Sequence, residues 1–235
     1  GSINQESPLR CEKLYFYSDD CSSVVNLNNE QNAFESIEGK SIVAWINNSV
    51  GYEVVGTGVE TKGEMTLKTV TGDIILSAPL VMNDDIVFGM TVSPAGNVIF
   101  NYDAGMILCS QKSAADKGIH ITRPIILQKD AQINSETVNH GYISFAESIT
   151  TTESKALTLY GSTFDIPINA LIGDSAHPLA KLEIHSENSL ELGKPGLLAA
   201  SNASYTVYAK ELYCDAPLHL VNNFSLNDAN TAYTE

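Results

Sequence analysis

The residues with the most reactive side chains are spread along the whole chain. The five histidines are His120, His140, His177, His185 and His219, and no two of them have HExxH or another helix-borne metal spacing. No Gly-x-Ser-x-Gly nucleophile motif occurs, and no glycine-rich loop of the kind that cradles phosphate is present. The sequence therefore predicts no catalytic residue, no metal ligand and no bound cofactor.

Carboxylates offer the strongest catalytic alternative, because glycoside hydrolysis uses two of them across a sugar. The candidates are Asp73, Asp84, Asp85, Asp103, Asp165 and Asp174. We expect them at turns, where aspartate accepts hydrogen bonds from the local backbone. Asn83-Asp84-Asp85 carries oxygen ligands suited to Ca²⁺, but we interpret it as a tight turn. A polysaccharide lyase also needs a cation beside its acids, and Arg123 is the only arginine beyond Arg10.

The four cysteines form two contrasting pairs. Cys11 and Cys21 lie ten residues apart in a polar, turn-rich segment and are a candidate disulfide. Such a bridge would agree with an oxidising, extracellular location. Cys109 and Cys214 lie in apolar runs, where we expect buried thiols.

The elements that must position these residues follow a repeated phrase. Pro79, Pro124, Pro167 and Pro217 each follow a polar residue by two positions and precede an apolar run. A recurrence in this range is typical of stacked-repeat architectures. Because proline cannot donate to a sheet ladder, it favours the first residue of a strand. The four prolines are therefore predicted to open four equivalent strands.

Several short apolar runs lie between successive prolines, separated by Gly, Asn, Asp and Ser. We interpret each interval as two coils of roughly 20–25 residues, the size of stacked structural repeats. The predicted fold is an all-β, right-handed parallel β-helix, in which equivalent side chains of successive coils stack in a narrow core. A β-sandwich with accidentally similar strands is the alternative, because it also has regular short strands and turns.

The repeat divides the chain unevenly. Residues 62–235 are predicted to form the β-helix repeats, whereas residues 1–61 do not obey the pattern and include a predicted helical turn at Phe34–Glu38. The first 61 residues are either a separate subdomain or a cap with degenerate first coils, and we favour the second because terminal repeats are atypical. Gln111–Lys117 is predicted to be a loop on the side of the rod. Because Thr231–Glu235 has no evident cap, we expect a fragment of a longer protein.

Composition excludes two classes of partner. The 235 residues carry a net charge of −15, and the thirteen Lys and Arg residues are scattered singly, so phosphate-rich nucleic acid would be repelled. No stretch approaches the roughly 20 apolar residues that a membrane-spanning helix needs. The acidic exterior favours a hydrated chain that resists self-association, and we expect the fragment to be monomeric.

Two segments resemble a family of bacterial surface proteins. Thr71–Leu80 (TGDIILSAPL) resembles the repeating unit of filamentous-haemagglutinin-type exoproteins, and Phe164–Ile184 (FDIPINALIGDSAHPLAKLEI) resembles a module of large adhesins and autotransporter passengers. The likeness covers about residues 62–222. It implies a β-helical stalk, export across a Gram-negative outer membrane and a role in attachment, and it carries no catalytic residues.

The predicted function is that of a non-catalytic segment of a secreted bacterial surface protein, either an adhesive rod or a spacer. The expected partner is a host-cell surface receptor or a glycan. The expected location is the cell surface or the medium, reached by an autotransporter or a two-partner-secretion route. The alternative is a carbohydrate-active β-helix enzyme, either a polysaccharide lyase or a glycoside hydrolase. Such an enzyme would want an aromatic sugar platform, yet the single Trp45 lies outside the repeats.

Overall fold

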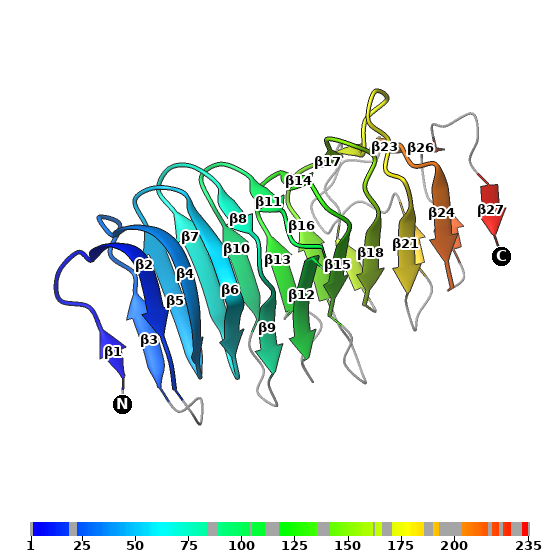
Figure 1. Ribbon diagram of the computed structural model, residues 1–235. Coiled ribbons are helices and arrows are strands. Elements are labelled where there is room, and N and C mark those ends of the chain that lie inside the picture. The colour runs from blue at the N-terminus through cyan, green and yellow to red at the C-terminus, as the bar shows by residue number, and fades with distance from the viewer. Residues whose placement is uncertain are drawn as a thin grey trace.

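The chain winds into successive coils of short β-strands, as the computed structural model shows (Figure 1). The structure describes residues 2–18, 23–83, 89–103, 105–110, 118–135, 142–161, 163–165, 171–185, 190–192, 204–215, 218–220, 223–226 and 232–234. Among these residues every strand pairing is parallel and no helix occurs. The predicted parallel β-helix is confirmed. The β-sandwich is excluded, because its sheets are antiparallel.

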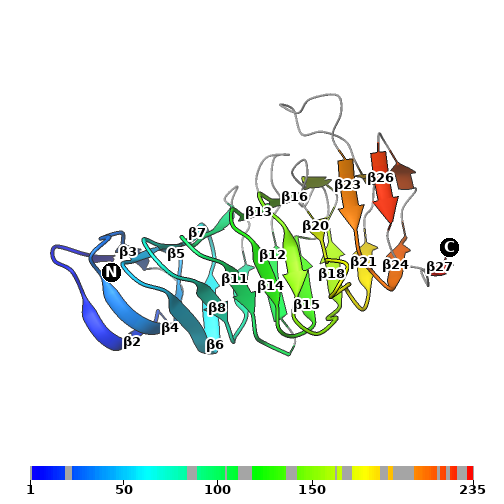
Figure 2. The ribbon, with the colours of Figure 1, turned by 90° about the horizontal axis from the view of Figure 1, so that it is seen from above.

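The strands form three faces of an elongated rod (Figures 1 and 2). The first face contains β1 (Ile3–Asn4), β3 (Val24–Leu27), β5 (Val43–Asn48), β7 (Met65–Thr69), β10 (Met90–Ser93), β13 (Gly118–Ile121), β16 (Tyr142–Phe145) and β19 (Thr163–Asp165). The second contains β8 (Ile74–Leu76), β11 (Val98–Phe100), β14 (Ile125–Leu127), β17 (Ile149–Thr151), β20 (Leu171–Ile172), β23 (Ser204–Val207) and β26 (Asn223–Leu226). The third contains β9 (Leu80–Asn83), β12 (Gly105–Ser110), β15 (Ala131–Asn134), β18 (Leu157–Tyr160), β21 (Leu182–His185), β24 (Glu211–Cys214) and β27 (Ala232–Thr234). A further pair joins β22 (Leu190–Leu192) to β25 (Leu218–Leu220).

The first coils differ from the later ones in having long strands. β2 (Arg10–Phe16), β4 (Ala33–Ser41) and β6 (Tyr52–Thr61) run across both the second and the third face. β6 pairs with β8 through Tyr52 and with β9 through Val59. From β8 onward the long strand is divided in two. The division between β8 and β9 contains Pro79, which cannot donate to a ladder, whereas the next ones contain turn residues such as Asp103 and Asp130. Strand pairing therefore continues from β1–β6 into β7–β9 without a change of sheet.

Coil length follows from the register of the first face. Met65 pairs with Met90, Met90 with Ile119, and Ile119 with Ile143, which are steps of 25, 29 and 24 residues. The longest step contains residues 111–117, the predicted side loop, which themselves lie outside the described residues. Extra residues between strands lengthen one coil while the strands on either side keep their register.

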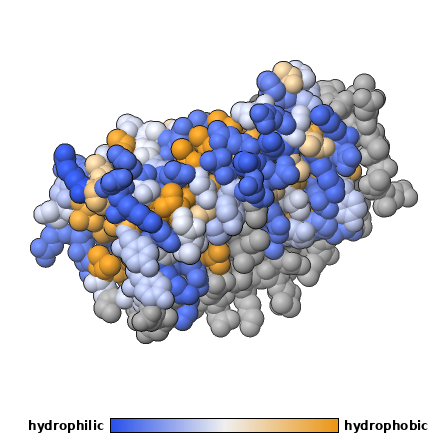
Figure 3. Space-filling model, viewed as in Figure 1, coloured by the Kyte–Doolittle hydropathy of each residue, from blue (hydrophilic) through white to orange (hydrophobic). Residues whose placement is uncertain are grey.

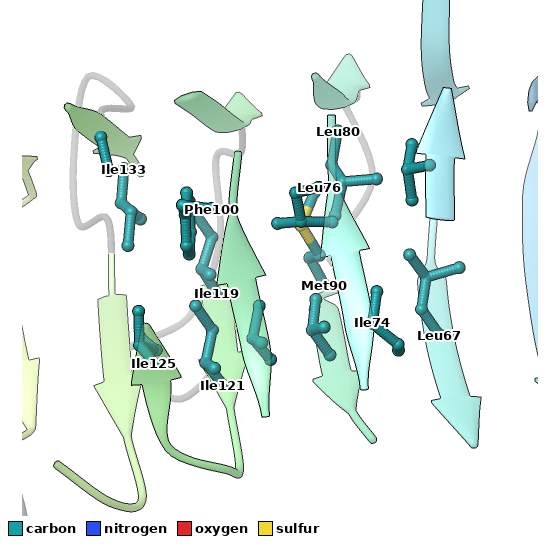
Figure 4. Close-up of a cluster of buried hydrophobic side chains, with 14 of the residues drawn as sticks. Leu67, Ile74, Leu76, Leu80, Met90, Phe100, Ile119, Ile121, Ile125 and Ile133 are labelled. Atoms are coloured by element: carbon teal, nitrogen blue, oxygen red, sulfur yellow. The ribbon is translucent and has the colours of Figure 1, made fainter. Parts of the chain in front are cut away.

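The core is a set of columns in which similar side chains lie above one another. On the second face Ile74, Val98 and Ile125 pair in register, and each is at most 1% exposed. Phe100 lies between Leu76 and Leu127 in the next column of that face. Figure 4 shows Ile74, Phe100 and Ile125 in the interior of the rod, together with side chains of the other faces such as Leu67 and Leu80. Neighbouring strands are about 4.8 Å apart, so each layer is in van der Waals contact with the next.

Buried polar side chains satisfy the backbone where the chain turns between faces. Asn48, at the end of β5, is fully buried. Its Nδ2 donates to the carbonyls of Phe34 (2.8 Å) and Val50 (3.0 Å), and its Oδ1 accepts from the Phe34 amide (3.1 Å). This one side chain ties two coils together at the corner that leads into β6.

The prediction that the prolines open equivalent strands is wrong for the two that the structure describes. Pro79 precedes β9 on the third face, whereas Pro124 precedes β14 on the second. The interval of 45 residues is longer than one coil and shorter than two, so it moves the proline to another face. Each still starts a strand, and the carbonyls of Pro79 and Pro124 accept from Val59 and Val98 of neighbouring coils. Pro167 and Pro217 lie outside the described residues.

The predicted helical turn at Phe34–Glu38 is also wrong, because these residues lie within β4. Phe34 and Ile37 are both buried although they are three residues apart, which is the spacing of one helix face. β4 departs from strict alternation at Glu35 and Ser36 before it resumes with Ile37. The local irregularity, seen alone, mimics a helical period.

Outward side chains of the second face include an aliphatic stripe. Ile75, Ile99 and Ile126 pair in register and are half-buried. Figure 3 shows apolar atoms gathered at the top of the rod, where Figure 1 places β8 and β11. The side chains of the adjacent residues Ile99 and Phe100 on β11 therefore point in opposite directions, Ile99 outward and Phe100 into the core.

We predict that Phe100→Ala lowers the free energy of unfolding by about 3–5 kcal/mol, because it opens a cavity between Leu76 and Leu127. The matched control is Ile99→Ala, which should cost less than about 1 kcal/mol because its side chain is half-exposed. Urea unfolding followed by circular dichroism measures both. Equal losses would show that the stacked core does not carry the stability of the coil.

Candidate functional site

A bulge in β6 creates the most elaborate outward structure of the first coils. Between the pairs Ile37–Val54 and Gly39–Val59, β4 advances two residues and β6 advances five. Gly56 (φ 64°) and Gly58 (φ 87°) adopt left-handed conformations in this bulge. A Cβ atom on Gly58 would collide with the carbonyl oxygen of Pro79. The two glycines of Gly56-Thr57-Gly58 therefore allow the backbone conformation of the bulge.

The bulge holds the carboxylate of Glu38. Thr57 donates to Oε1 of Glu38 from both its amide and its hydroxyl, each at 2.9 Å. Lys13 Nζ, on β2, donates to Oε2 at 2.6 Å. The hydrogen bond from Lys13, then those from the Thr57 amide and hydroxyl, lower the pKa of Glu38 from 4.5 to about 2. Glu38 is therefore a fixed anion at any physiological pH.

Two exposed tyrosines lie next to this network. Tyr15 pairs in register with Glu38, and Tyr17 follows on the same side of the chain. Each residue is 60% exposed, and their rings are parallel within 5° with centroids 6.4 Å apart. Lys40 and Glu60 form an ion pair of 2.9 Å on the neighbouring strands. We call this surface the tyrosine face: Lys13, Tyr15, Tyr17, Glu38, Lys40, Thr57 and Glu60.

A second cluster lies on the third face toward the other end of the rod. Its centre is His185, whose Nδ1 is 2.7 Å from Asp215 Oδ2 and whose Nε2 is 3.2 Å from Glu183 Oε1. The ring of Tyr160 stacks on His185 at 4.4 Å and 7°, and Tyr213 lies at 5.6 Å. We call this group, with Lys181, the histidine cluster: Tyr160, Lys181, Glu183, His185, Tyr213 and Asp215.

Charges inside the histidine cluster stabilise one another. Lys181 Nζ lies 3.0 Å from Glu183 Oε2 and 5.5 Å from the centre of the Tyr213 ring. Partial burial raises the pKa of Glu183, but Lys181 and then His185 outweigh burial and lower it. A histidine between two carboxylates is a group that can accept and return a proton. With two carboxylates beside one ring, this arrangement resembles acid–base machinery more than the single His177–Asp174 pair at 3.6 Å does.

The aspartates that the sequence singled out do not share a site where the structure describes them. Asp73 Oδ1 accepts from the amide (2.6 Å) and side chain (3.0 Å) of Asn97 in the next coil. Asp174 Oδ1 accepts from the amides of His177 (2.7 Å) and Ala176 (2.8 Å), and the His177 amide is the main cause of its lowered pKa. Both lie between strands, as predicted, but only Asp174 accepts from its own turn, whereas Asp73 links two coils.

The other aspartates divide differently. Asp103 pairs with Lys129 at 3.0 Å and is also at a turn. Asp165 is the last residue of β19, so its predicted turn position is wrong. Asp84 and Asp85, and with them the Ca²⁺ alternative, lie outside the described residues. Among the described residues no group of three His, Cys, Asp or Glu residues is placed to hold a metal ion.

The candidate disulfide stays a prediction. Cys11 is exposed on β2, and Cys21 lies outside the described residues. Cys214 packs against the core but is only half-buried, so it is less enclosed than the buried thiol that its apolar run predicted. Among the histidines, His120, His185 and His219 lie in strands, and the ring of His120 is 5.4 Å from that of Tyr142.

Sequence reasoning missed the tyrosine face. Leu14–Tyr17 was interpretable as an aromatic strand, and glycines inside a strand are a signal for a bulge. The Thr57–Glu38 contact spans 19 residues and depends on that bulge, so neither residue stands out alone.

Comparison of the chain with known protein families, with curated proteins and with solved structures finds no match. No helix that the structure describes has the length and apolar character needed to cross a bilayer.

We predict that Glu38→Gln lowers the urea midpoint at pH 7, because the variant loses the ion pair with Lys13. The folded-state pKa of about 2 lies below the unfolded value of 4.5. The stabilisation is therefore complete above pH 4.5 and is lost as the pH falls toward 2. Wild type and variant should converge over that interval.

The matched control is Glu35→Gln, an exposed acid on the same strand, which should match the wild type at both ends of the range. A midpoint difference for Glu38→Gln that does not change between pH 7 and pH 2 would contradict the assigned charge network.

Proposed function

We propose that the chain is an adhesive, non-catalytic rod of a secreted bacterial surface protein, which attaches the cell to a host or other surface. The observation that carries the proposal is the continuous parallel stack of coils with ordered side-chain groups on its outer surface. A stack of this kind extends by adding coils, each of which contacts only its neighbours. The resemblance of Thr71–Leu80 and Phe164–Ile184 to surface adhesins supports the same proposal.

The outward groups suit recognition by a surface. Alternate residues of each strand point outward, and the pairing of strands sets their positions in two directions. On the tyrosine face the backbone is paired on β4 and β6, and Glu38 is held by three hydrogen bonds. A ligand that meets a fixed array loses less conformational freedom on the protein side. The proposed partners are a host-cell receptor or a glycan.

We predict that beads coated with the chain adhere to cultured epithelial cells or to a glycan-coated surface. The control beads carry an inert protein of similar net charge, because the chain's −15 would repel an anionic cell surface without a specific contact. Retained beads are counted after washing under flow. Equal retention of both kinds of bead on every surface would contradict an adhesive role.

The second candidate function is a carbohydrate-active enzyme, and the hydrogen-bonded His185–Asp215 pair favours it. Glu183 supplies a second carboxylate beside the same ring. Such groups could move a proton to or from a sugar oxygen. Asp174 has a single histidine, His177, with Nδ1 at 3.6 Å, and Asp103 pairs with Lys129, so neither has a second carboxylate beside a histidine as His185 does.

We expect the purified chain to release no reducing or unsaturated sugar from a panel of acidic and neutral polysaccharides. The readouts are reducing-end assay and ultraviolet absorbance of unsaturated products. Release that disappears in His185→Gln and Asp215→Asn, but persists in the turn variant Asp174→Asn, would favour the enzyme and contradict the non-catalytic proposal.

A further inference from the structure

We propose that the tyrosine face binds a neutral polysaccharide by stacking its sugar rings on Tyr15 and Tyr17. This inference rests on the proposed adhesive function and deepens it by assigning a place and a ligand class. It starts from an unusual exposure, because aromatic rings usually contribute their area to the core. Here two rings leave 60% of each residue open to solvent and share one orientation.

The spacing of the rings is set by the strand. Residues two apart on a strand are about 6.6 Å apart, and the two ring centroids are 6.4 Å apart. β2 is paired with β4 from Arg10 to Phe16, so the backbone beneath Tyr15 is fixed, and Tyr17 directly follows the last paired residue. The two parallel rings present exposed apolar faces one strand repeat apart, which suits the flat C–H face of a pyranose and its neighbour along a chain.

The polar groups around the rings suit hydroxyls. Glu38 remains an anion and keeps acceptor capacity beyond its three hydrogen bonds. Thr57 is exposed in the bulge, and the phenol groups of both tyrosines donate and accept. Sugar hydroxyls need both kinds of partner, and here they lie beside an apolar surface.

Local charge decides between neutral and charged ligands. The chain carries −15, but on this face Lys13 pairs with Glu38 and Lys40 pairs with Glu60. Each cation is matched by an acid, so the face offers no excess charge to a sulfated or uronic polymer. A polyanion would also approach against the field of the whole chain. The complementary ligand is therefore an uncharged polysaccharide.

The test is a binding assay with insoluble cellulose, chitin, β-1,3-glucan and starch, with heparin and polygalacturonate as charged probes. We expect wild type to bind at least one neutral polymer. Tyr15→Ala and Tyr17→Ala should each weaken that binding about tenfold or more, and the double variant should abolish it. Tyr15→Phe with Tyr17→Phe should stay within about threefold of wild type, because stacking is kept.

Tyr102→Ala is the matched control, because Tyr102 is a partly exposed tyrosine in a turn away from this strand, and it should bind like wild type. Circular dichroism and thermal melting should show that all variants fold, since the substituted side chains lie outside the core. Light scattering tests whether a second copy of the chain occupies this face. A wild-type dimer that becomes a monomer in the double alanine variant would overturn the proposal.

Three further results would overturn the inference: preference for heparin or polygalacturonate, wild-type binding to none of the neutral polymers, or neutral-polymer binding that the double alanine variant retains. These differ from failure of the proposed function. Coated beads that still adhere to cells when they carry the double variant would remove the tyrosine face as the attachment site and leave the adhesive rod standing.

Discussion

The structure depends on the contact between equivalent inward side chains of successive coils. A single coil cannot bury Ile74 or Leu80, because its interior is only one strand layer deep. The next coil places Val98 directly over Ile74, and its strand β12 pairs with the strand that carries Leu80, at the spacing of paired strands. Hydrogen bonding and apolar contact thus act along the same axis. A column tolerates a change in size, as from Leu76 to Phe100 to Leu127, because neighbouring columns adjust across the narrow core.

This constraint leaves the outer surface free to vary. Strand pairing fixes where an outward side chain lies, but the only demand on its chemical type is a favourable contact with the outward side chains of neighbouring coils. The aliphatic stripe of Ile75, Ile99 and Ile126, the ring stack of Tyr160 on His185, and the ion pair of Lys40 with Glu60 are three solutions to that demand. Among the described residues, the strand pairing shifts register at the β6 bulge, which contains two left-handed glycines. The bulge, held by the ionised carboxylate of Glu38, is therefore the part of the first coils best suited to a binding role.

How far the sequence predicts this structure depends on the range of the interaction concerned. Short alternating runs between turn residues are local, so the parallel β-helix and the coil length of roughly 20–25 residues were accessible. The face on which Pro79 or Pro124 begins a strand was not, because it depends on the lengths of every intervening turn. The helical turn predicted at Phe34–Glu38 was wrong for a related reason, because a local irregularity of β4 places the buried residues Phe34 and Ile37 three positions apart, as in a helix. The contact between Glu38 and Thr57 was beyond local reasoning, although the glycines that make it possible were visible.

The distribution of cations follows from the same geometry. In the sequence the thirteen Lys and Arg residues appear scattered, which suggests solubility and nothing more. In the folded chain several are cross-coil partners: Lys13 with Glu38, Lys40 with Glu60, Arg123 with Glu147 and Lys129 with Asp103. Acids on adjacent coils would repel one another across a strand spacing, so a cation between coils removes a destabilising contact even where the ion pair itself contributes little. Single cations one coil apart from their acids therefore reduce the repulsion between acids of adjacent coils. The same spacing leaves patches of balanced charge, such as the tyrosine face, within a chain of strongly negative total charge.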